Sequence, residues 1–539
     1  MPPVLNVENL TVQLPAGADR LNAVEDVSFS VAPGEIVCVV GESGSGKSVT
    51  AHSIMGLLPR RQFTIASGRV LLEGDELLTK SAAEMRAIRG DRISMIFQEP
   101  MTALNPVMKV GDQIAEVLDI HTDLNEGERR ARALEVMEAV RLPDPERMID
   151  AYPHQLSGGQ RQRIMIAAAL VLDPALLIAD EPTTALDVTT QAQILKLIKE
   201  LRERRNTGVL FITHDFGVVA EVASRVVVMQ HGKVVEQGTT EEVLRRPKHD
   251  YTRMLIRSVP SLSPPARAPI DNEPIVLQTN NLTKTYVSGG FFAKRRVVEA
   301  AKDVNLLVRR GETLGVVGES GSGKSTVARC IARLIDPTDG AILIKGADVA
   351  KLSASALRPH RKRVQIVFQD PYRSLNPRRN VGASITEGPV NFGMSPQAAH
   401  ERARELMRLV GLDPDALSRF PHQFSGGQRQ RVCIARALAM EPEILVADEP
   451  VSALDVSVQA QVLELIDDVR KRFNLAVLFI THDLRVAAQV CDRIAVMHKG
   501  EVVEEGATAA VFGAPQHAYT RALFDSAPGR NFEFGKFET

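Results

Sequence analysis

Two glycine-rich octapeptides carry the residue types that hold phosphate. The same eight letters, GESGSGKS, occur at Gly41–Ser48 and at Gly318–Ser325. Each follows an apolar run that predicts a strand (EIVCVV and ETLGVV) and opens a predicted helix, which is the context that a phosphate loop requires. Glycines let backbone N–H groups close around phosphate oxygens, the lysine meets the charge of the β- and γ-phosphates, and the last serine suits Mg²⁺. The pattern therefore predicts two nucleoside-triphosphate sites.

A pair of adjacent acids ends a second apolar run in each half of the chain. Asp180 and Glu181 close LLIADEP, and Asp448 and Glu449 close ILVADEP. We expect the aspartate to hold magnesium, usually through water, and the glutamate to accept a proton from an attacking water. Acid pairs at strand ends are also common on protein surfaces, so this interpretation depends on the phosphate loop upstream.

Histidines and glutamines recur near these acids. His214 and His482 each follow an apolar run in FITHD. A lone histidine there is more often a core or capping residue, but its repetition favours a sensor of the γ-phosphate. Gln98 and Gln369, in IFQEP and VFQDP, are expected to contact the metal and the attacking water.

The motifs belong to a long internal repeat. The block SGGQRQR begins at Ser157 and again at Ser425, which is 268 residues later, and the ADEP and FITHD blocks repeat at the same interval. The two phosphate loops begin at residues 41 and 318, which is 277 residues apart, so the length difference lies between the glycine loop and the SGGQ block. A repeat of this kind indicates two copies of one domain.

The elements that position these residues can be read from apolar runs. Strand-like runs at Glu35–Val40, Leu176–Ala179 and Val209–Thr213 alternate with longer helical patterns such as Gln191–Arg205. This alternation predicts a parallel sheet flanked by helices in each half. Five prolines between residues 258 and 274 favour extended, solvated chain, so we place a linker there, between a domain of residues 1–257 and one of residues 275–539.

Composition excludes several classes of protein. With 44% hydrophobic and 24% charged residues the chain of 539 residues should fold, and a net charge of −1 gives no field that would draw it to nucleic acid. The four cysteines show no C-x-x-C spacing and are expected to be buried thiols. We find no apolar run of about 18 residues and no signal-peptide pattern, so the protein should neither be secreted nor span a membrane by itself.

Taken together, these motifs resemble the ATP-binding cassette superfamily over nearly the whole chain. The resemblance implies an α/β fold with two tandem cassettes, each with a RecA-like parallel-sheet core, an antiparallel β subdomain and a helical signature subdomain. Leu156–Gln160 is the full LSGGQ signature, whereas the second copy reads FSGGQ, with Phe424 in place of leucine. In this superfamily the signature reaches the nucleotide of the opposite cassette, so the two cassettes of one chain would pair with each other.

The resemblance also implies the site residues. Both sites keep their acid and histidine, so we expect two hydrolytic sites with ATP and Mg²⁺ as cofactors. Catalysis is assigned to Glu181, His214, Glu449 and His482, and the metal to Ser48, Gln98, Asp180, Ser325, Gln369 and Asp448. Asp187 and Asp455, in the ALDV motifs, are expected at the interface. ATP contacts are assigned to Gly41, Glu42, Ser43, Gly44, Ser45, Gly46, Lys47, Ser48, Gln98, Ser157, Gly158, Gly159, Gln160, Tyr286, Gly318, Glu319, Ser320, Gly321, Ser322, Gly323, Lys324, Ser325, Gln369, Ser425, Gly426, Gly427 and Gln428.

One position differs between the halves. Alignment of NLTVQL with NLTKTY places Leu14 opposite Tyr286, where the superfamily usually stacks an aromatic ring on adenine. Our hypothesis is that the first site holds adenine less tightly. The alternative is that Leu14 packs adequately on the base, because apolar contact replaces much of a stacking interaction.

Three further blocks narrow the resemblance. The sequences QEPMTALNP and QDPYRSLNP, the YPHQ and FPHQ segments before the signatures, and the P-x-H-x-Y-T tails at Pro247–Thr252 and Pro515–Thr520 are similar to ATPases of dipeptide, oligopeptide and nickel importers. The likeness is strongest to the fused ATPase of microcin C-type peptide importers. It implies a peripheral subunit on the cytoplasmic face of a bacterial inner membrane.

The same likeness implies partners. They are two integral-membrane permease subunits and an extracytoplasmic substrate-binding protein, and residues Met101–Pro106 and Pro371–Pro377 are the expected docking surfaces. The alternatives are a soluble tandem cassette protein acting on ribosomes or nucleic acid, and an exporter motor. The cargo is left open among peptides, peptide antibiotic conjugates, nickel, glutathione and opines.

Overall fold

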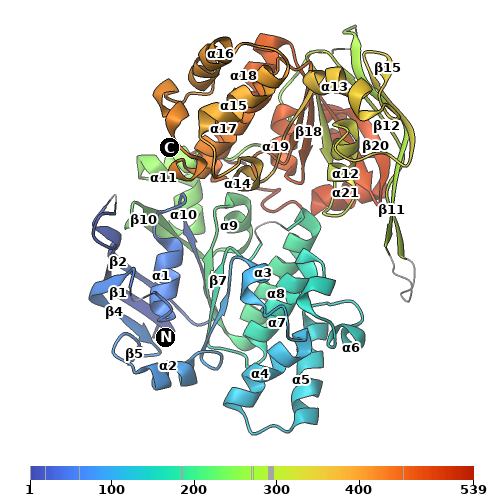
Figure 1. Ribbon diagram of the computed structural model, residues 1–539. Coiled ribbons are helices and arrows are strands. Elements are labelled where there is room, and N and C mark those ends of the chain that lie inside the picture. Colours follow the sequence, from blue (N-terminus) through green and yellow to red (C-terminus); the bar gives the residue numbers. More distant parts are fainter. Residues whose placement is uncertain are drawn as a thin grey trace. The chain divides into compact units, whose positions relative to one another are not determined.

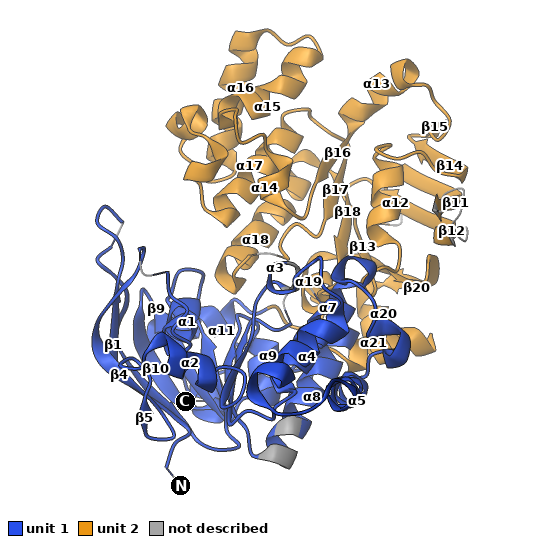
Figure 2. Ribbon diagram, turned by 60° about the horizontal axis from the view of Figure 1, so that its bottom comes forward, with its two compact units in different colours: residues 1–259, 528–539 blue, residues 260–527 orange. Residues whose placement is uncertain are grey.

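The chain folds into two compact units. The computed structural model describes residues 2–18, 20–59, 61–183, 186–268, 270, 272–288, 296–452 and 454–538. Unit 1 comprises residues 1–259 together with 528–539, and unit 2 comprises residues 260–527 (Figure 2). Ala185 and Ala453 of the ALDV motifs, Pro269 and Asp271 of the predicted linker, and the side chain of Met101 lie outside the described part.

A six-stranded sheet forms the centre of unit 1 (Figure 1), in the order β10-β9-β3-β8-β7-β6. All neighbouring strands are parallel except β9 and β10, which pair antiparallel at one edge. The inner strands β3, β7 and β8 are buried along their whole length, as expected for apolar runs covered on both faces. The strands are β3 (Ile36–Val40), β6 (Ile93–Ile96), β7 (Leu176–Asp180), β8 (Gly208–Ile212), β9 (Arg225–Gln230) and β10 (Lys233–Thr239).

A second, antiparallel sheet of four strands covers one side of the first helix of unit 1. Its order is β2-β1-β4-β5, and its strands are β1 (Leu5–Gln13), β2 (Asn22–Val31), β4 (Thr64–Leu72) and β5 (Asp75–Glu76). One buried apolar cluster contains residues of this sheet, of the central sheet and of α1 (Lys47–Ile54), including Val27, Val37 and Ile54. Helix α1, which follows the phosphate loop, therefore packs between the two sheets.

The remaining helices of unit 1 form a helical part and a C-terminal part. In the helical part, α4, α5 and α7 pack on one another. Its helices are α3 (Pro100–Ala103), α4 (Val110–His121), α5 (Glu126–Ala139), α6 (Pro145–Met148), a 3₁₀ turn (Pro153–Gln155) and α7 (Gly158–Leu170). The short helix α2 (Ala82–Ile88) instead packs on the apolar cluster of the two sheets, through Met85 and Ile88. The others are α8 (Val188–Arg205), α9 (Phe216–Val222), α10 (Thr240–Arg245) and α11 (Asp250–Arg257).

Unit 2 repeats this architecture. Its central sheet has the order β16-β17-β18-β13-β19-β20 and its antiparallel sheet the order β12-β11-β14-β15. The strands are β11 (Ile275–Ser288), β12 (Arg296–Arg309), β13 (Thr313–Val317), β14 (Asp339–Ile344), β15 (Ala347–Asp348), β16 (Val364–Val367), β17 (Ile444–Asp448), β18 (Ala476–Thr481), β19 (Arg493–His498) and β20 (Glu501–Ala507). The predicted α/β class, with a parallel core, an antiparallel sheet and a helical part, is confirmed in both units.

The helices of unit 2 follow the same order as those of unit 1. They are α12 (Lys324–Ile331), α13 (Ala354–Arg363), α14 (Pro371–Ser374), α15 (Val381–Asn391), α16 (Pro396–Leu409), α17 (Gly426–Leu438), α18 (Val456–Phe473), α19 (Leu484–Val490), α20 (Thr508–Gly513) and α21 (Ala518–Asp525), with 3₁₀ turns at Pro414–Ser418 and Pro421–Gln423. None of the described helices of either unit is long and apolar enough to cross a bilayer. All four cysteines are buried, and burial raises the pKa of Cys330 and Cys433 to about 11.

The proline-rich segment after α11 belongs to unit 2. Its described residues form no helix or strand, but several of them are tied to α19 and the turn after it. Gln489 donates to the carbonyls of Ser261 and Ser263 at 2.9 and 3.1 Å, and Arg267 pairs with Asp492 at 2.9 Å. These bonds fix a segment whose composition alone favours solvated chain.

Candidate phosphate-loop sites

The strand order of unit 1 brings the predicted site residues to one edge of the central sheet. Strands β3, β8, β7 and β6 are neighbours and run parallel, so their carboxyl ends lie side by side. The phosphate loop follows β3, His214 follows β8, Asp180 and Glu181 end and follow β7, and Gln98 follows β6. Four motifs that are spread over 174 residues, from Gly41 to His214, therefore converge.

The phosphate loop of unit 1 has a backbone that its glycines make possible. Gly41 and Gly46 have φ values of 148° and 105°, and a Cβ on Gly41 would stand 2.2 Å from the carbonyl oxygen of Met229. The ammonium of Lys47 is buried inside the loop and donates to the carbonyls of Gly41 and Glu42 at 2.7 and 3.0 Å. The loop thus surrounds a cation at the start of α1, where the helix dipole also favours an anion.

A hydroxyl and a carboxylate lie together beside this loop. Ser48 Oγ donates to Asp180 Oδ1 at 3.1 Å, and Asp180 is only 3% exposed. Burial raises the pKa of Asp180, the hydrogen bond from Ser48 opposes this, and the charge of Glu181 adds to it. Oxygen donors of this kind suit Mg²⁺, so the donor set fits a magnesium–nucleotide complex. In such a complex Ser48, Asp180 and Gln98 would hold the ion.

Glu181 lies between the glutamine and the histidine that the sequence singled out. Gln98 Nε2 donates to one carboxylate oxygen at 2.9 Å, and His214 Nδ1 lies 3.4 Å from the other. The residue has a φ of 47°, in the left-handed region that non-glycine residues seldom adopt, and its N–H donates to the carbonyl of Ile212 at 2.9 Å. Backbone conformations of this kind are strained. They are found most often at active sites, where the surrounding structure holds a side chain in place.

Unit 2 holds the same arrangement. Lys324 donates to the carbonyls of Gly318 and Glu319, both at 2.7 Å, and Ser325 Oγ donates to Asp448 at 2.9 Å. Gln369 donates to the carboxylate of Glu449 at 2.7 Å, and His482 Nδ1 lies 3.2 Å from the same carboxylate. Glu449 has a φ of 49°. In both units the glutamine that follows the edge strand, the acid pair and the histidine of FITHD therefore come together.

Close contact between Glu449 and His482 shifts the pKa of both side chains. Burial acts to raise the pKa of Glu449, but the hydrogen bond from His482 and the charges of His482 and Lys324 outweigh it, so this pKa is lowered. Burial acts to lower the pKa of His482, but the hydrogen bond and charge of Glu449 outweigh it, so this pKa is raised. The pair therefore favours a carboxylate facing an imidazolium.

The SGGQ motifs begin helices. In unit 1, Ser157 and Gln160 form a capping box at the start of α7, with bonds of 3.3 Å from Gln160 N–H and 2.9 Å from Ser157 N–H. Ser425 and Gln428 form the same box at the start of α17. Gly158, Gly159, Gly426 and Gly427 occupy the first turns, where free N–H groups favour an anion.

The other predicted residues lie at element ends or on strands. Asp187 caps α8 by accepting from the N–H of Thr190 at 2.9 Å, and Asp455 occupies the N-cap position of α18. Tyr286, on β11, is 42% exposed, and the ammonium of Lys284 lies 5.3 Å from its ring centre. Leu14, just after β1, is half-buried. The difference in adenine binding between the two halves stays a prediction.

Sequence reasoning missed one contact in each unit. The hydroxyls of Tyr251 and Tyr519 accept hydrogen bonds from the N–H groups of Glu42 and Glu319 in the phosphate loops, each at 3.0 Å. Both tyrosines belong to the P-x-H-x-Y-T tails. From the sequence, these tails indicated only a similarity to importer ATPases. The signal that could have found them is the repetition of the motif in both halves.

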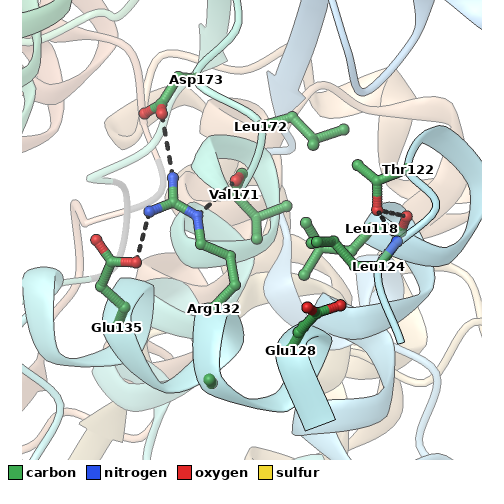
Figure 3. A pocket seen from close by; sticks show the side chains of 10 residues that line it. Leu118, Thr122, Leu124, Glu128, Arg132, Glu135, Val171, Leu172 and Asp173 are labelled. Atoms are coloured by element: carbon green, nitrogen blue, oxygen red, sulfur yellow. Dashed lines mark hydrogen bonds and ion pairs between the residues drawn. The ribbon is translucent and has the colours of Figure 1, made fainter. Parts of the chain in front are cut away.

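A separate hollow of about 530 Å³ lies in the helical part of unit 1 (Figure 3). It is bordered by the end of α4, by α5 and by the turn after α7. Arg132, on α5, pairs with Glu135 of the same helix at 2.7 Å and with Asp173 in the turn after α7 at 3.1 Å. It shares no residue with the predicted site, so its lining gives no reason to place nucleotide there.

The residues that meet at the phosphate loop of each unit define a class of protein. Each unit joins a phosphate loop to a serine–aspartate pair and to a glutamate held between glutamine and histidine. This is the residue set of a nucleoside triphosphatase that uses a phosphate loop. The protein is therefore a tandem P-loop nucleotide-binding protein.

Comparison with known proteins narrows this class. The family model described as ABC transporter matches residues 24–184 and 301–452, and the model described as the C-terminal region of oligopeptide/dipeptide transporters matches residues 235–301 and 503–537. The chain belongs to the ABC transporter family, as one of its two-cassette ATPases.

Curated relatives match over almost the full length. The glutathione import ATP-binding proteins GsiA of Shigella boydii and of Escherichia coli K12 are each 46% identical to the chain over 557 aligned positions, covering 97% of this chain and 89% of theirs. Among solved structures, the dimeric ATP-binding cassette MJ0796 bound to ADP and Pi is 30% identical, covers 44% of this chain and 98% of its own, and has a TM-score of 0.40.

Proposed function

We propose that the chain is the energy-coupling ATPase of a bacterial importer for peptides or peptide-like compounds. The observation that carries this proposal is the 46% identity over 97% of the chain with glutathione import ATP-binding proteins. The match to the C-terminal region of oligopeptide/dipeptide transporters supports the same substrate class. Glutathione is a tripeptide, so it heads the list of cargoes to test.

Each site residue would have its own role in ATP hydrolysis. Lys47 would leave the loop carbonyls to neutralise the β- and γ-phosphates, and Glu181 would accept the proton of the attacking water, which Gln98 helps to orient. His214, 3.4 Å from Glu181, would report the state of the γ-phosphate. Mg²⁺, held by Ser48, Gln98 and Asp180, would supply positive charge where negative charge develops. Lys324, Glu449 and the residues around them would do the same in unit 2.

The pairing of the cassettes stays a prediction from the sequence. It would bring Ser425–Gln428 to the nucleotide at Lys47, and Ser157–Gln160 to the nucleotide at Lys324. Each nucleotide would then favour a closed pair, and phosphate release would favour an open one. Fusion in one chain keeps the two partners at high effective concentration.

The expected partners are two permease subunits and an extracytoplasmic binding protein, with the chain held peripherally at the cytoplasmic face of the inner membrane. The predicted docking segments lie after the glutamines, at α3 and α14. Tyr372, on α14, is 65% exposed, and Val107, next to the first segment, is 79% exposed. A partner that binds these segments would cover both side chains.

Co-purification with the membrane subunits tests this proposal. We expect wild-type ATPase activity in the complex to rise with binding protein loaded with glutathione or a dipeptide. Tyr372→Asp should reduce the amount of chain that co-purifies. Leu21→Asp alters an apolar residue that is 70% exposed and lies outside the docking segments, and it should not.

The outcomes separate the parts of the proposal. Stimulation by nickel or another non-peptide cargo, without stimulation by peptides, would overturn the substrate class. Failure of any membrane protein to co-purify with the wild-type chain would overturn the importer function and favour a soluble tandem cassette protein.

A further inference from the structure

One tail tyrosine in each unit reaches the first turn of the phosphate loop. The two partners, Tyr251 and Glu42, are 209 residues apart, and Tyr519 and Glu319 are 200 residues apart. In unit 1 the tyrosine hydroxyl also donates to the carboxylate of Glu42 at 3.2 Å. Tyr251 is only 6% exposed, so this contact is made inside the fold.

In each unit the tyrosine and the loop lysine bind the N–H and the C=O of the same peptide group. The peptide between Gly41 and Glu42 offers its C=O to Lys47 at 2.7 Å and its N–H to Tyr251 at 3.0 Å. The peptide between Gly318 and Glu319 is held in the same way by Lys324 at 2.7 Å and by Tyr519 at 3.0 Å. Gly41 and Gly318 have φ values of 148° and 151°, so this is where the chain turns from strand into loop. The orientation of this peptide decides where the following amides point.

The rest of the tail motif fixes the tyrosine. In unit 1, the carboxylate of Glu236 accepts from the N–H groups of Lys248 and His249 at 2.7 and 3.1 Å. His249 Nδ1 then accepts from the N–H of Tyr251 at 3.2 Å, which caps α11, and Thr252 is fully buried. The ring is therefore held by the start of a helix anchored on β10.

Unit 2 repeats the bonds that fix the tail motif. Glu504 accepts from the N–H groups of Gln516 and His517 at 2.7 and 3.0 Å, and His517 Nδ1 accepts from the N–H of Tyr519 at 3.1 Å. The ring of Tyr519 also stacks on His498, with centroids 4.0 Å apart. Two copies with the same geometry make a chance contact a poor explanation for the motif.

We propose that Tyr251 and Tyr519 are positioning residues of the two phosphate loops, through which the C-terminal helices of each cassette set nucleotide affinity. The inference rests on the proposed ATPase function. When the lysine ammonium turns toward phosphate it leaves the loop carbonyl, and the tyrosine hydroxyl keeps its hold on the other side of the same peptide. The loop then stays in its binding conformation, and less ordering cost falls on the ligand.

Removal of the hydroxyl alone tests the proposal in the full-length chain. Tyr251→Phe keeps the ring and its packing, and Glu449→Gln leaves the first site as the one that turns over. In that background we expect Tyr251→Phe to raise the KM for ATP about three- to tenfold, which is the effect of one lost hydrogen bond, with kcat changed less than twofold. Tyr519→Phe in a Glu181→Gln background should act on the second site in the same way.

The chain offers a matched control. Tyr152, before the first signature, corresponds to Phe420 in unit 2, and both rings stack on a histidine two residues later, at 5.7 and 5.9 Å. Tyr152→Phe should therefore leave KM unchanged. A second measurement needs no catalysis: hydrogen exchange of the amides of residues 41–46 in the nucleotide-free chain should be faster in Tyr251→Phe than in wild type.

Three outcomes would count against the positioning role of the tyrosines or against the proposed function. An unchanged KM together with unchanged amide exchange overturns the proposal. A fall in kcat and melting temperature without a rise in KM also overturns it, because it indicates a merely structural role. If the wild-type chain hydrolyses no ATP, the proposed function fails, whereas the exchange measurement still tests the anchor.

Discussion

Arg245 and Glu538 form an ion pair at 3.3 Å although 293 residues separate them in the sequence. Arg245 is the last residue of α10, and the N–H of Glu538 also donates to its carbonyl at 2.9 Å. The guanidinium lies 5.2 Å from the ring centre of Phe532. One arginine of unit 1 thus holds the C-terminal segment, residues 528–539, at several points.

Deletion of residues 528–539 should destabilise unit 1. Phe532, Phe534 and Phe537 are half-buried, and Phe537 lies 5.3 Å from the guanidinium of Arg257. Partial burial of three aromatic rings suggests a loss of about 1–3 kcal/mol in the free energy of unfolding. Faster hydrogen exchange in α9, α10 and α11 would measure it. Lys536→Ala, which removes only an exposed pair with Glu533, should change little, and unchanged exchange after the deletion would contradict the packing.

Gly217→Ala should act through the same segment. A Cβ at this position of α9 would stand 2.7 Å from the carbonyl oxygen of Pro528. The equivalent residue of unit 2 is Arg485, whose N–H donates to Asp483 at 2.8 Å just as that of Gly217 donates to Asp215, so a side chain is compatible with this helix start.

We therefore expect Gly217→Ala to lower the free energy of unfolding by about 1–2 kcal/mol in the full chain. In the chain that lacks residues 528–539 it should be neutral or stabilising, because alanine favours helix more than glycine. Denaturant titration of the four proteins measures the coupling. An equal effect in both backgrounds would show that the segment does not oppose the side chain.

Loss of both glutamates should abolish hydrolysis. Glu181 and Glu449 are the carboxylates positioned by glutamine and histidine, so Glu181→Gln with Glu449→Gln is expected to lower kcat at least about 100-fold. Each single variant should lose at least half of the activity, because both sites are complete. A silent single variant would mean that one cassette does not hydrolyse ATP. Retained binding of a fluorescent ATP analogue is the control for folding.

The stability of unit 2 should depend on pH through His482 and Glu449. The pKa of His482 is raised, so its contribution is complete below the ordinary histidine value of 6.5 and is lost as pH rises through the raised value. The pKa of Glu449 is lowered, so its contribution is present above 4.5 and is lost as pH falls through the lowered value. The full contribution of the pair is therefore present between pH 4.5 and pH 6.5.

Comparison of wild type with His482→Gln measures this dependence. The wild-type advantage in the free energy of unfolding should fall as pH rises above 6.5, with a slope of at most about 1.4 kcal/mol per pH unit, because one proton is involved. Glu449→Gln removes the partner and should flatten the slope. An advantage that grows with pH would contradict the raised pKa.

The two sites should differ in their affinity for ATP. Tyr286 offers an exposed ring on β11, whereas Leu14 stands at the corresponding place in unit 1. We expect Tyr286→Leu to weaken ATP binding at the second site about threefold to tenfold, the usual worth of an aromatic contact, and Leu14→Tyr to strengthen it at the first. Titrations of variants with one working site provide the measurement. Equal affinities in the two single-site proteins would refute the difference.

The sequence alone predicted two domains, their α/β class and the residues that lie beside each phosphate loop. Each motif is a short run in which residue type and local order already state the requirement, as in the glycines of Gly41–Ser48 or the acids after a buried strand. Parallel strands bring their carboxyl ends to one edge, so the convergence of Asp180, Glu181 and His214 also follows from the pattern.

Which distant segments hold the site in place depends on how the whole chain packs. The residue pattern does not predict the left-handed backbone of Glu181 and Glu449. The repeated tail motif singles out Tyr251 and Tyr519 but does not tell what they contact, because a contact across some 200 residues changes no nearby periodicity. The segment after Ala527 reads as a plain continuation of the second domain, yet its aromatic side chains pack on unit 1. Its place depends on the folded surface of unit 1, which neither composition nor local periodicity encodes.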